Sequence, residues 1–250
     1  MKKSGCCILL SLLLLVLMPS SKANAIIFSD NFETGLDGTI WYREQIGTAQ
    51  WVHATDGTNG YITNQEQKSG TLDILTQKND FTDMVFASDV MFKADWWGAD
   101  WRYIHFRATN DPTPYGYSLY MGVRVPTGAG DCIGLTVHNP DGTYTSLIPT
   151  TSHDWDLHKW YSFKIQMIDY NIKVKVWEKS GLEPDEWLFD VTDTNATYSN
   201  GRIGFAGYKK AVNYVDNVLV DTPVIPEPSS LILLGIGLLG AGIFRRRNFN

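Results

Sequence analysis

The chain has 250 residues, of which 44% are hydrophobic, and this length and composition are typical of one globular domain with a sizeable core. Residues 26–225 carry 15 lysines and arginines against 26 aspartates and glutamates, a net charge of −11, whereas the whole chain carries −6. So acidic a domain repels phosphate backbones and anionic lipid, which argues against a nucleic-acid partner.

The first 25 residues have the pattern of a signal peptide. Lys2 and Lys3 precede an apolar segment over residues 6–18, and Ala23-Asn24-Ala25 forms an A-x-A cleavage site. We therefore expect an exported protein whose mature chain begins near residue 26. Cys132 is then the one cysteine left, which excludes an intramolecular disulfide and favours a buried thiol.

Residues 26–222 show the pattern of β-strands. Apolar and polar residues alternate over 161–168 and again over 172–177, which predicts a hairpin with one buried face. Similar segments recur at 85–92, 103–108, 117–125, 133–137, 203–206 and 214–220. Gly, Asn, Asp and Pro residues separate them, and no segment has a helical period of useful length. The sequence therefore predicts an all-β domain, an antiparallel jelly-roll β-sandwich.

Strand and turn motifs along this domain resemble the concanavalin A-like lectin/glucanase fold in its LamG-like form. The segments that carry the resemblance are 28–33, 160–161, 173–177, 185–187, 201–205 and 215–218. The resemblance spans nearly the whole mature domain and implies that the first and last strands lie side by side. We therefore expect residues 28–32 to pair near 215–220, which would protect both ends of the domain.

A run of aromatic and charged residues is the strongest candidate for ligand binding. Its members are Asp95, Trp96, Trp97, Asp100, Trp101, Arg102 and Tyr103. Aromatic rings on a loop stack against sugar faces, while Asp and Arg side chains bind hydroxyl groups. An extracellular polysaccharide or cell-surface glycan is the partner that this run favours. The alternative is that some of these rings plug one end of the sandwich.

Oxygen ligands near the two ends of the domain suggest calcium as the one candidate cofactor. If the terminal strands pair, Asp30, Asn31, Asp216 and Asn217 converge, and hard cations prefer carboxylate and carbonyl oxygens. The competing interpretation is that these residues end strands and cap turns. We keep a structural Ca²⁺ ion bound by Asp30 and Asp216 as a hypothesis.

Evidence for catalysis is weaker. Retaining glycosidases need two carboxyl groups about 5 Å apart, and the active families of the resembled fold carry them in a Glu-x-Asp-x-x-Glu motif, which this sequence lacks. We therefore expect a non-catalytic protein that binds carbohydrate. A glycan hydrolase or lyase would need an unusual site, built for example from Asp95, Asp100 and Glu44. A structural matrix protein without a specific ligand is the third hypothesis.

The C-terminal segment, residues 223–250, has the organisation of a sorting signal. Its parts are Pro226, Glu227 and Pro228, an apolar run over 231–244, and Arg245, Arg246 and Arg247. As a helix the apolar run is about 21 Å long, shorter than the hydrocarbon core, and the arginines place the preceding domain outside. This order resembles the PEP-CTERM sorting signal, which implies an exosortase-type processing enzyme. We expect a transient membrane anchor and then a cell-surface or extracellular protein associated with exopolysaccharide; the alternative is an ordinary C-terminal anchor.

Overall fold

The computed structural model describes residues 25–46, 48–65, 70–93, 100–109, 114–125 and 130–223, without the side chains of residues 45, 46, 100, 124 and 125. Residues 25–223 form a compact unit, and the described part is all-β without a helix. No helix in these ranges is therefore long and apolar enough to cross a membrane. Residues 1–24 of the predicted signal peptide and residues 224–250 of the predicted sorting signal lie outside the described residues.

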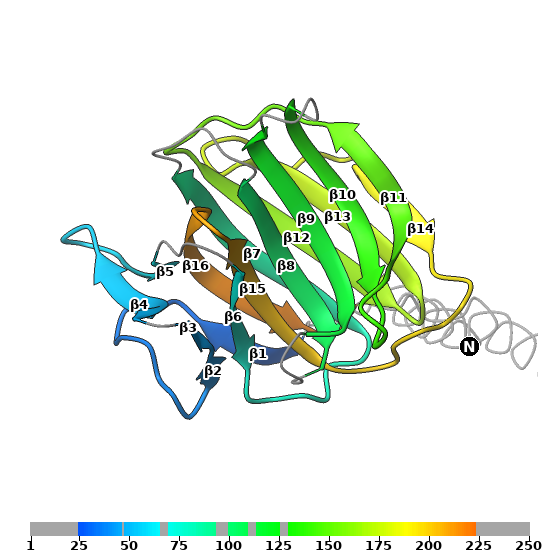
Figure 1. Cartoon of the computed structure of the whole chain (residues 1–250), viewed down its shortest axis with the longest axis horizontal. Helices are drawn as coiled ribbons and strands as arrows, with labels where there is room; N and C mark the ends of the chain where they lie inside the picture. Colours follow the sequence, from blue (N-terminus) through cyan, green and yellow to red (C-terminus); the bar gives the residue numbers. More distant parts are fainter. Residues whose placement is uncertain are drawn as a thin grey trace, which may run out of the picture. The chain divides into compact units, whose positions relative to one another are not determined.

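One layer of the fold is a nine-stranded antiparallel sheet (Figure 1). Its strands are, in spatial order, β14 (Phe189–Thr192), β13 (Asn171–Glu178), β12 (Trp160–Ile168), β7 (Met84–Lys93), β16 (Val212–Asp221), β5 (Gly60–Asn64), β4 (Ala49–Thr55) and β3 (Gln45–Ile46). The ninth strand, β1 (Ile26–Asp30), pairs with β16.

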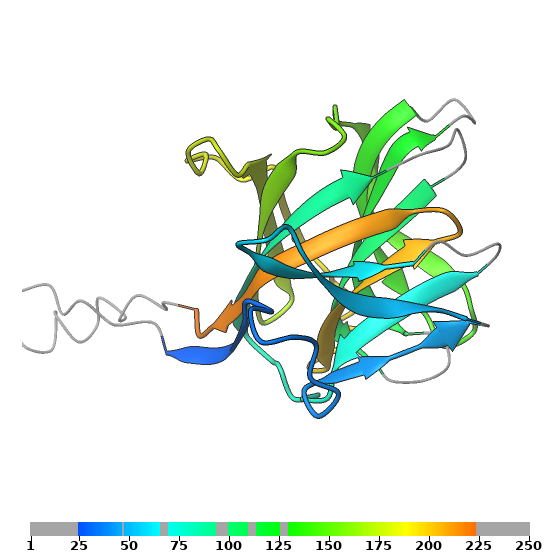
Figure 2. The same ribbon diagram turned by 90° about the vertical axis from the view of Figure 1, so that its left-hand side faces the viewer.

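The second layer is a seven-stranded antiparallel sheet that lies against the first. Its strands are, in spatial order, β11 (Tyr144–Ser152), β10 (Gly130–His138), β9 (Gly116–Val125), β8 (Asp100–Ala108), β15 (Arg202–Tyr208), β6 (Thr71–Thr76) and β2 (Trp41–Arg43). Figure 2 shows the sandwich from the side. The predicted antiparallel β-sandwich is confirmed.

The two ends of the domain lie side by side, as the sequence predicts. Phe28 in β1 is opposite Val220 in β16, and Asp30 is opposite Val218. Just outside the strands, the Ala25 amide donates a hydrogen bond of 3.1 Å to the Thr222 hydroxyl, and the Thr222 amide donates one to the Ala25 carbonyl. The pairing gives the backbone groups of β1 and of the last residues of β16 hydrogen-bond partners, which protects both ends of the domain.

The core lies between the two sheets and follows from the alternation of the strands. In β12 the residues Tyr161, Phe163, Ile165 and Met167 face inward and are buried, while the side chains between them are half-buried. Each such aromatic or aliphatic side chain contributes about 1.5–3 kcal/mol when fully buried. Cys132 is also buried and free, and burial raises the pKa of its thiol, which makes it unreactive.

Candidate functional site

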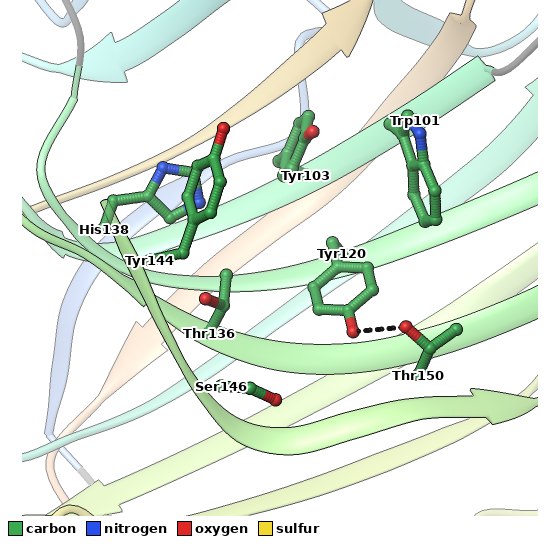
Figure 3. A pocket seen from close by; sticks show the side chains of 8 residues that line it. All are labelled: Trp101, Tyr103, Tyr120, Thr136, His138, Tyr144, Ser146 and Thr150. Carbon is green, nitrogen blue, oxygen red and sulfur yellow. Dashed lines mark hydrogen bonds between the residues drawn. The ribbon is translucent and has the colours of Figure 1, made fainter. Parts of the chain in front are cut away.

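The outer face of the seven-stranded sheet carries a pocket of about 370 Å³ over strands β8 to β11 (Figure 3). The residues that line it are Trp101 and Tyr103 from β8, Tyr120 from β9, Thr136 and His138 from β10, and Tyr144, Ser146 and Thr150 from β11. We call this pocket the β8–β11 groove. Because side chains of alternate residues share one face of a strand, neighbouring strands in register bring these residues together.

Tyr120 takes its place in the groove because a glycine lies beside it. Gly134 in β10 is paired with Tyr120, and a Cβ atom at Gly134 would collide with the Tyr120 ring. The bare backbone therefore lets the ring lie across β10, where its hydroxyl forms a hydrogen bond of 2.9 Å with Thr150 in β11. The ring of Trp101 meets Tyr120 edge-on, with 5.7 Å between centroids.

A second aromatic cluster surrounds His138. The Tyr103 ring is 6.0 Å from the His138 ring and perpendicular to it, and the Tyr144 ring is 5.2 Å away on another side. Tyr144 is 72% exposed, so a flat ligand has direct access to its ring. The groove thus presents two separate groups of rings, one around Trp101 and one around His138.

His138 is a neutral imidazole at physiological pH. Burial and, to a smaller extent, the neighbouring His105 lower its pKa to about 4, against the opposing effect of Asp73. Its Nε2 atom is buried and has no hydrogen-bond partner among the described residues. The other seven side chains of the groove are aromatic or hydroxylic, and burial raises the pKa of the Tyr103 phenol. Among the residues that the structure describes, the eight side chains that line the groove are therefore uncharged at neutral pH.

A buried polar chain lies beside the groove on the same face. His105 Nε2 is 3.1 Å from an Asp73 carboxylate oxygen, and His105 Nδ1 is 2.8 Å from the Ser118 hydroxyl. When the Asp73 carboxylate accepts a hydrogen bond from Nε2–H of His105, the Nδ1 atom accepts the hydrogen bond that the Ser118 hydroxyl donates. Asp73 is 5%, His105 3% and Ser118 1% exposed, so this chain fixes the sheet surface under the groove and does not present a nucleophile.

The polar chain continues to Glu44, next to β2. Burial and the neighbouring Asp73 carboxylate, with which Glu44 shares a hydrogen bond, together raise the pKa of the Glu44 carboxyl to about 7. The Glu44 amide also donates a hydrogen bond of 3.0 Å to the Asp73 carbonyl. A carboxyl group that still holds its proton near neutral pH can act as an acid.

The structure separates the residues of the predicted aromatic run. Trp101 and Tyr103 line the groove, whereas Asp95, Trp96 and Trp97 lie outside the described residues, as does the side chain of Asp100. The prediction that Arg102 presents its guanidinium to a ligand is wrong. Arg102 is fully buried, donates a hydrogen bond of 3.0 Å to the Lys93 carbonyl and lies over the Phe92 ring.

The reason for this error is the strand that begins at Asp100. Since successive side chains of a strand point to opposite faces, a strand that exposes Trp101 and Tyr103 must turn the residue between them inward. Sequence reasoning also missed six of the lining residues, namely Tyr120, Thr136, His138, Tyr144, Ser146 and Thr150. Each is an ordinary outward residue of its own strand, and only the pairing of β8 to β11 makes them neighbours.

The carboxylates of the calcium hypothesis each engage protein donors. Asp30 accepts hydrogen bonds of 2.8 Å from the Phe32 amide and from the Trp41 indole. Asp216 is buried and accepts from the side chains of Asn59 and Asn217, each at 3.0 Å. The described residues contain no group of three or more His, Cys, Asp or Glu side chains arranged to hold a metal. The calcium site stays a prediction.

Comparison with known proteins gives one sequence match and a consistent fold. Residues 224–247 match the model of the PEP-CTERM protein-sorting motif, so the chain carries this sorting signal. No curated protein sequence matches the chain.

Three solved structures illustrate the fold. The carbohydrate-binding module CBM66 from Bacillus subtilis has 16% identity and a TM-score of 0.55, covering 73% of this chain and 95% of that one. The GH16 protein of the Bacteroides ovatus mixed linkage glucan PUL, in complex with a G4G4G3G product, has 13% identity and a TM-score of 0.56, covering 78% and 100%. The VIP36 exoplasmic/lumenal domain, in its Ca²⁺/Man3GlcNAc-bound form, has 9% identity and a TM-score of 0.55, covering 76% and 88%. At these identities the likeness establishes the fold, which is the concanavalin A-like β-sandwich.

Proposed function

We propose that this chain is an exported protein, sorted to the cell surface or extracellular matrix by an exosortase-type enzyme, whose β-sandwich binds polysaccharide in the β8–β11 groove without cleaving it. The C-terminal segment would hold it in the membrane until processing. Extracellular polysaccharide or a cell-surface glycan is the proposed partner. The observation that carries the proposal is the uncharged, aromatic lining of the groove.

The chemistry of the lining fits a sugar better than it fits a peptide or a charged metabolite. Flat apolar rings such as Trp101 and Tyr144 pack against the C–H faces of pyranose rings, and the hydroxyls of Tyr120 and Thr136 bind sugar hydroxyls. The two groups of rings lie at different positions along β8, one beside Trp101 and one beside Tyr103, which suits a ligand of more than one sugar unit.

Three further observations support the proposal. The PEP-CTERM motif at residues 224–247 is a sorting signal of exported proteins, and a domain at the cell surface would meet extracellular polysaccharide. Solved structures that share the fold include a carbohydrate-binding module and proteins in complex with glycans. The net charge of −11 over residues 26–225 also favours neutral ligands over anionic ones.

A glycan array tests the proposal. The mature protein is applied with and without calcium, beside the variants Trp101→Ala and Tyr120→Ala. We expect binding to a group of polysaccharides, reduced about fivefold or more in both variants, because each lost ring removes about 1–3 kcal/mol of contact. Trp160→Ala is the matched control, since Trp160 lies in β12 of the other sheet. Absence of binding to every glycan under both conditions would refute the proposal.

One observation favours a second candidate function, glycan hydrolysis. Glu44 holds its proton to about pH 7 beside Asp73, which is the protonation state that a general acid requires. Release of reducing ends from a bound polysaccharide, abolished by Glu44→Gln, would establish the enzyme and overturn the non-catalytic proposal. Binding without release of reducing ends would eliminate the hydrolase.

A further inference from the structure

We propose that the β8–β11 groove selects uncharged glycans through a hydrogen bond between one sugar hydroxyl and Nε2 of His138. This inference rests on the proposed function, because it assumes that a glycan occupies the groove. It adds the class of ligand and the residue that determines specificity.

The first observation is an unsatisfied polar atom. His138 Nε2 is buried and has no hydrogen-bond partner among the described residues, although the ring lines the groove. A buried polar group without a partner costs about 1–3 kcal/mol, and nearly all such groups in folded proteins are satisfied. A ligand hydroxyl in the groove would remove this cost on binding, so the atom is prepared for a partner that the protein itself does not supply.

The second observation is the charge state of the ring. Burial keeps the pKa of His138 near 4, so at neutral pH the imidazole has one N–H donor and one acceptor nitrogen. A sugar hydroxyl can donate as well as accept, and it matches either tautomer. A carboxylate or sulfate ligand finds no cation among the eight lining side chains, and Asp73 on the same sheet face repels it.

The third observation is the rigidity of the ring. Tyr103 and Tyr144 hold it edge-on from two strands, and its backbone lies in β10, opposite Gly116 of β9. The Tyr198 hydroxyl donates a hydrogen bond of 2.9 Å to the His138 carbonyl, which anchors the end of the strand. A group fixed before binding loses little entropy when the ligand arrives, which strengthens its contribution to affinity and to specificity.

Calorimetric titration of the full exported protein tests the inference with defined probes. The uncharged probes are hexasaccharides of β-1,3-glucose, β-1,4-glucose and β-1,4-mannose, and the anionic probe is a hexasaccharide of galacturonic acid. We expect at least one uncharged probe to bind and the anionic probe to bind at least tenfold more weakly. In His138→Phe, which keeps a ring and removes both nitrogens, affinity for the uncharged probe should fall about tenfold or more.

Two further variants separate recognition from structure. His138→Asn restores a side-chain donor and acceptor and should recover part of the affinity. His53→Phe is the matched control, because His53 in β4 of the other sheet also has a buried Nε2 without a partner among the described residues. Its affinity should equal that of the wild type.

The pH profile gives an independent readout. Wild-type affinity should stay constant between pH 6 and 8 and decline only as the pH approaches 4, and the decline should be absent in His138→Asn. The titratable groups that face the ring are His105 and Tyr103 of β8, Asp73 of β6 and Tyr144 of β11. A profile that changes between pH 6 and 8 in both proteins would assign the effect to a group other than His138, such as Glu44 beside Asp73, and would overturn the role of His138.

The outcomes distinguish this inference from the function on which it rests. If an uncharged probe binds and His138→Phe binds it as tightly as the wild type, the inference is wrong and the proposed function stands. Tighter binding of the galacturonate probe would likewise overturn only the inference. If no probe binds the wild type while the glycan array is also negative, both are refuted.

Discussion

Replacing Glu44 by glutamine should stabilise the fold at alkaline pH and leave it unchanged at acid pH. An unfolded glutamate releases its proton near the ordinary pKa of 4.5, whereas in the folded protein Glu44 retains its proton until about pH 7. The folded state is therefore penalised progressively as the pH rises from 4.5 to 7, because it must hold a proton or bury a charge beside Asp73. Glutamine carries no charge at any pH and can still donate a hydrogen bond to Asp73.

The size of the effect follows from the two pKa values. At 1.36 kcal/mol per pKa unit, the difference between 4.5 and about 7 corresponds to about 3 kcal/mol. The Glu44 side chain is only partly buried, and solvent screening reduces the expected gain to about 1–2 kcal/mol at pH 8. Below pH 4.5 both folded and unfolded carboxyls are protonated, so the gain disappears.

Urea unfolding at pH 4 and pH 8 measures this difference directly. The free energy of unfolding of Glu44→Gln should exceed that of the wild type at pH 8 and equal it at pH 4. Glu186→Gln is the control, because Glu186 is exposed and should change neither value. An equal gain at both pH values, or no gain at pH 8, would refute the carboxyl-pair reasoning.

Four other outcomes are expected. Gly134→Val should push the Tyr120 ring out of the groove, so glycan affinity should drop severalfold in a titration while the wild-type circular dichroism spectrum is retained. Gly204→Ala should lower the free energy of unfolding by about 1–3 kcal/mol in urea, because its Cβ atom would collide with the backbone of β6. Arg107→Met should lower the free energy of unfolding by about 2–4 kcal/mol in the same assay, since the buried guanidinium donates hydrogen bonds to three backbone carbonyls and pairs with the Asp83 carboxylate. If calcium binds at the terminal strands as hypothesised, adding it to chelator-treated protein should raise the melting temperature, and an unchanged value would eliminate that site.

The strands with clean alternation were predicted from sequence, and some of those without it were missed. The segments 161–168 and 172–177 correspond to β12 and β13 because each buries one face only. In contrast, β11 is exposed or half-buried along its whole length, and β6 is buried at five of its six positions. Neither pattern has a period of two, and both strands were missed, whereas β10 and β15, which also lack that period, were predicted as short segments between turn residues.

The groove could be predicted only in part, because its residues come from four strands that register brings together. Trp101 and Tyr103 were found through the density of aromatic residues in one short segment. Tyr120 and His138 have no such signal, since each is isolated among the residues of its own strand. Their role depends on cross-strand pairing and on the space left by Gly134, which are properties of the assembled sheet.

The most direct test of glycan binding in the β8–β11 groove is an NMR titration of the protein labelled with ¹⁵N. The indole N–H signals of Trp101, in the groove, and Trp160, on the other sheet, are followed while a bound oligosaccharide from the array is added. Saturable movement of the Trp101 signal with an unmoved Trp160 signal is the predicted result. Movement of Trp160 alone, with the Trp101 signal unchanged at saturation, would place the sugar elsewhere and contradict the account.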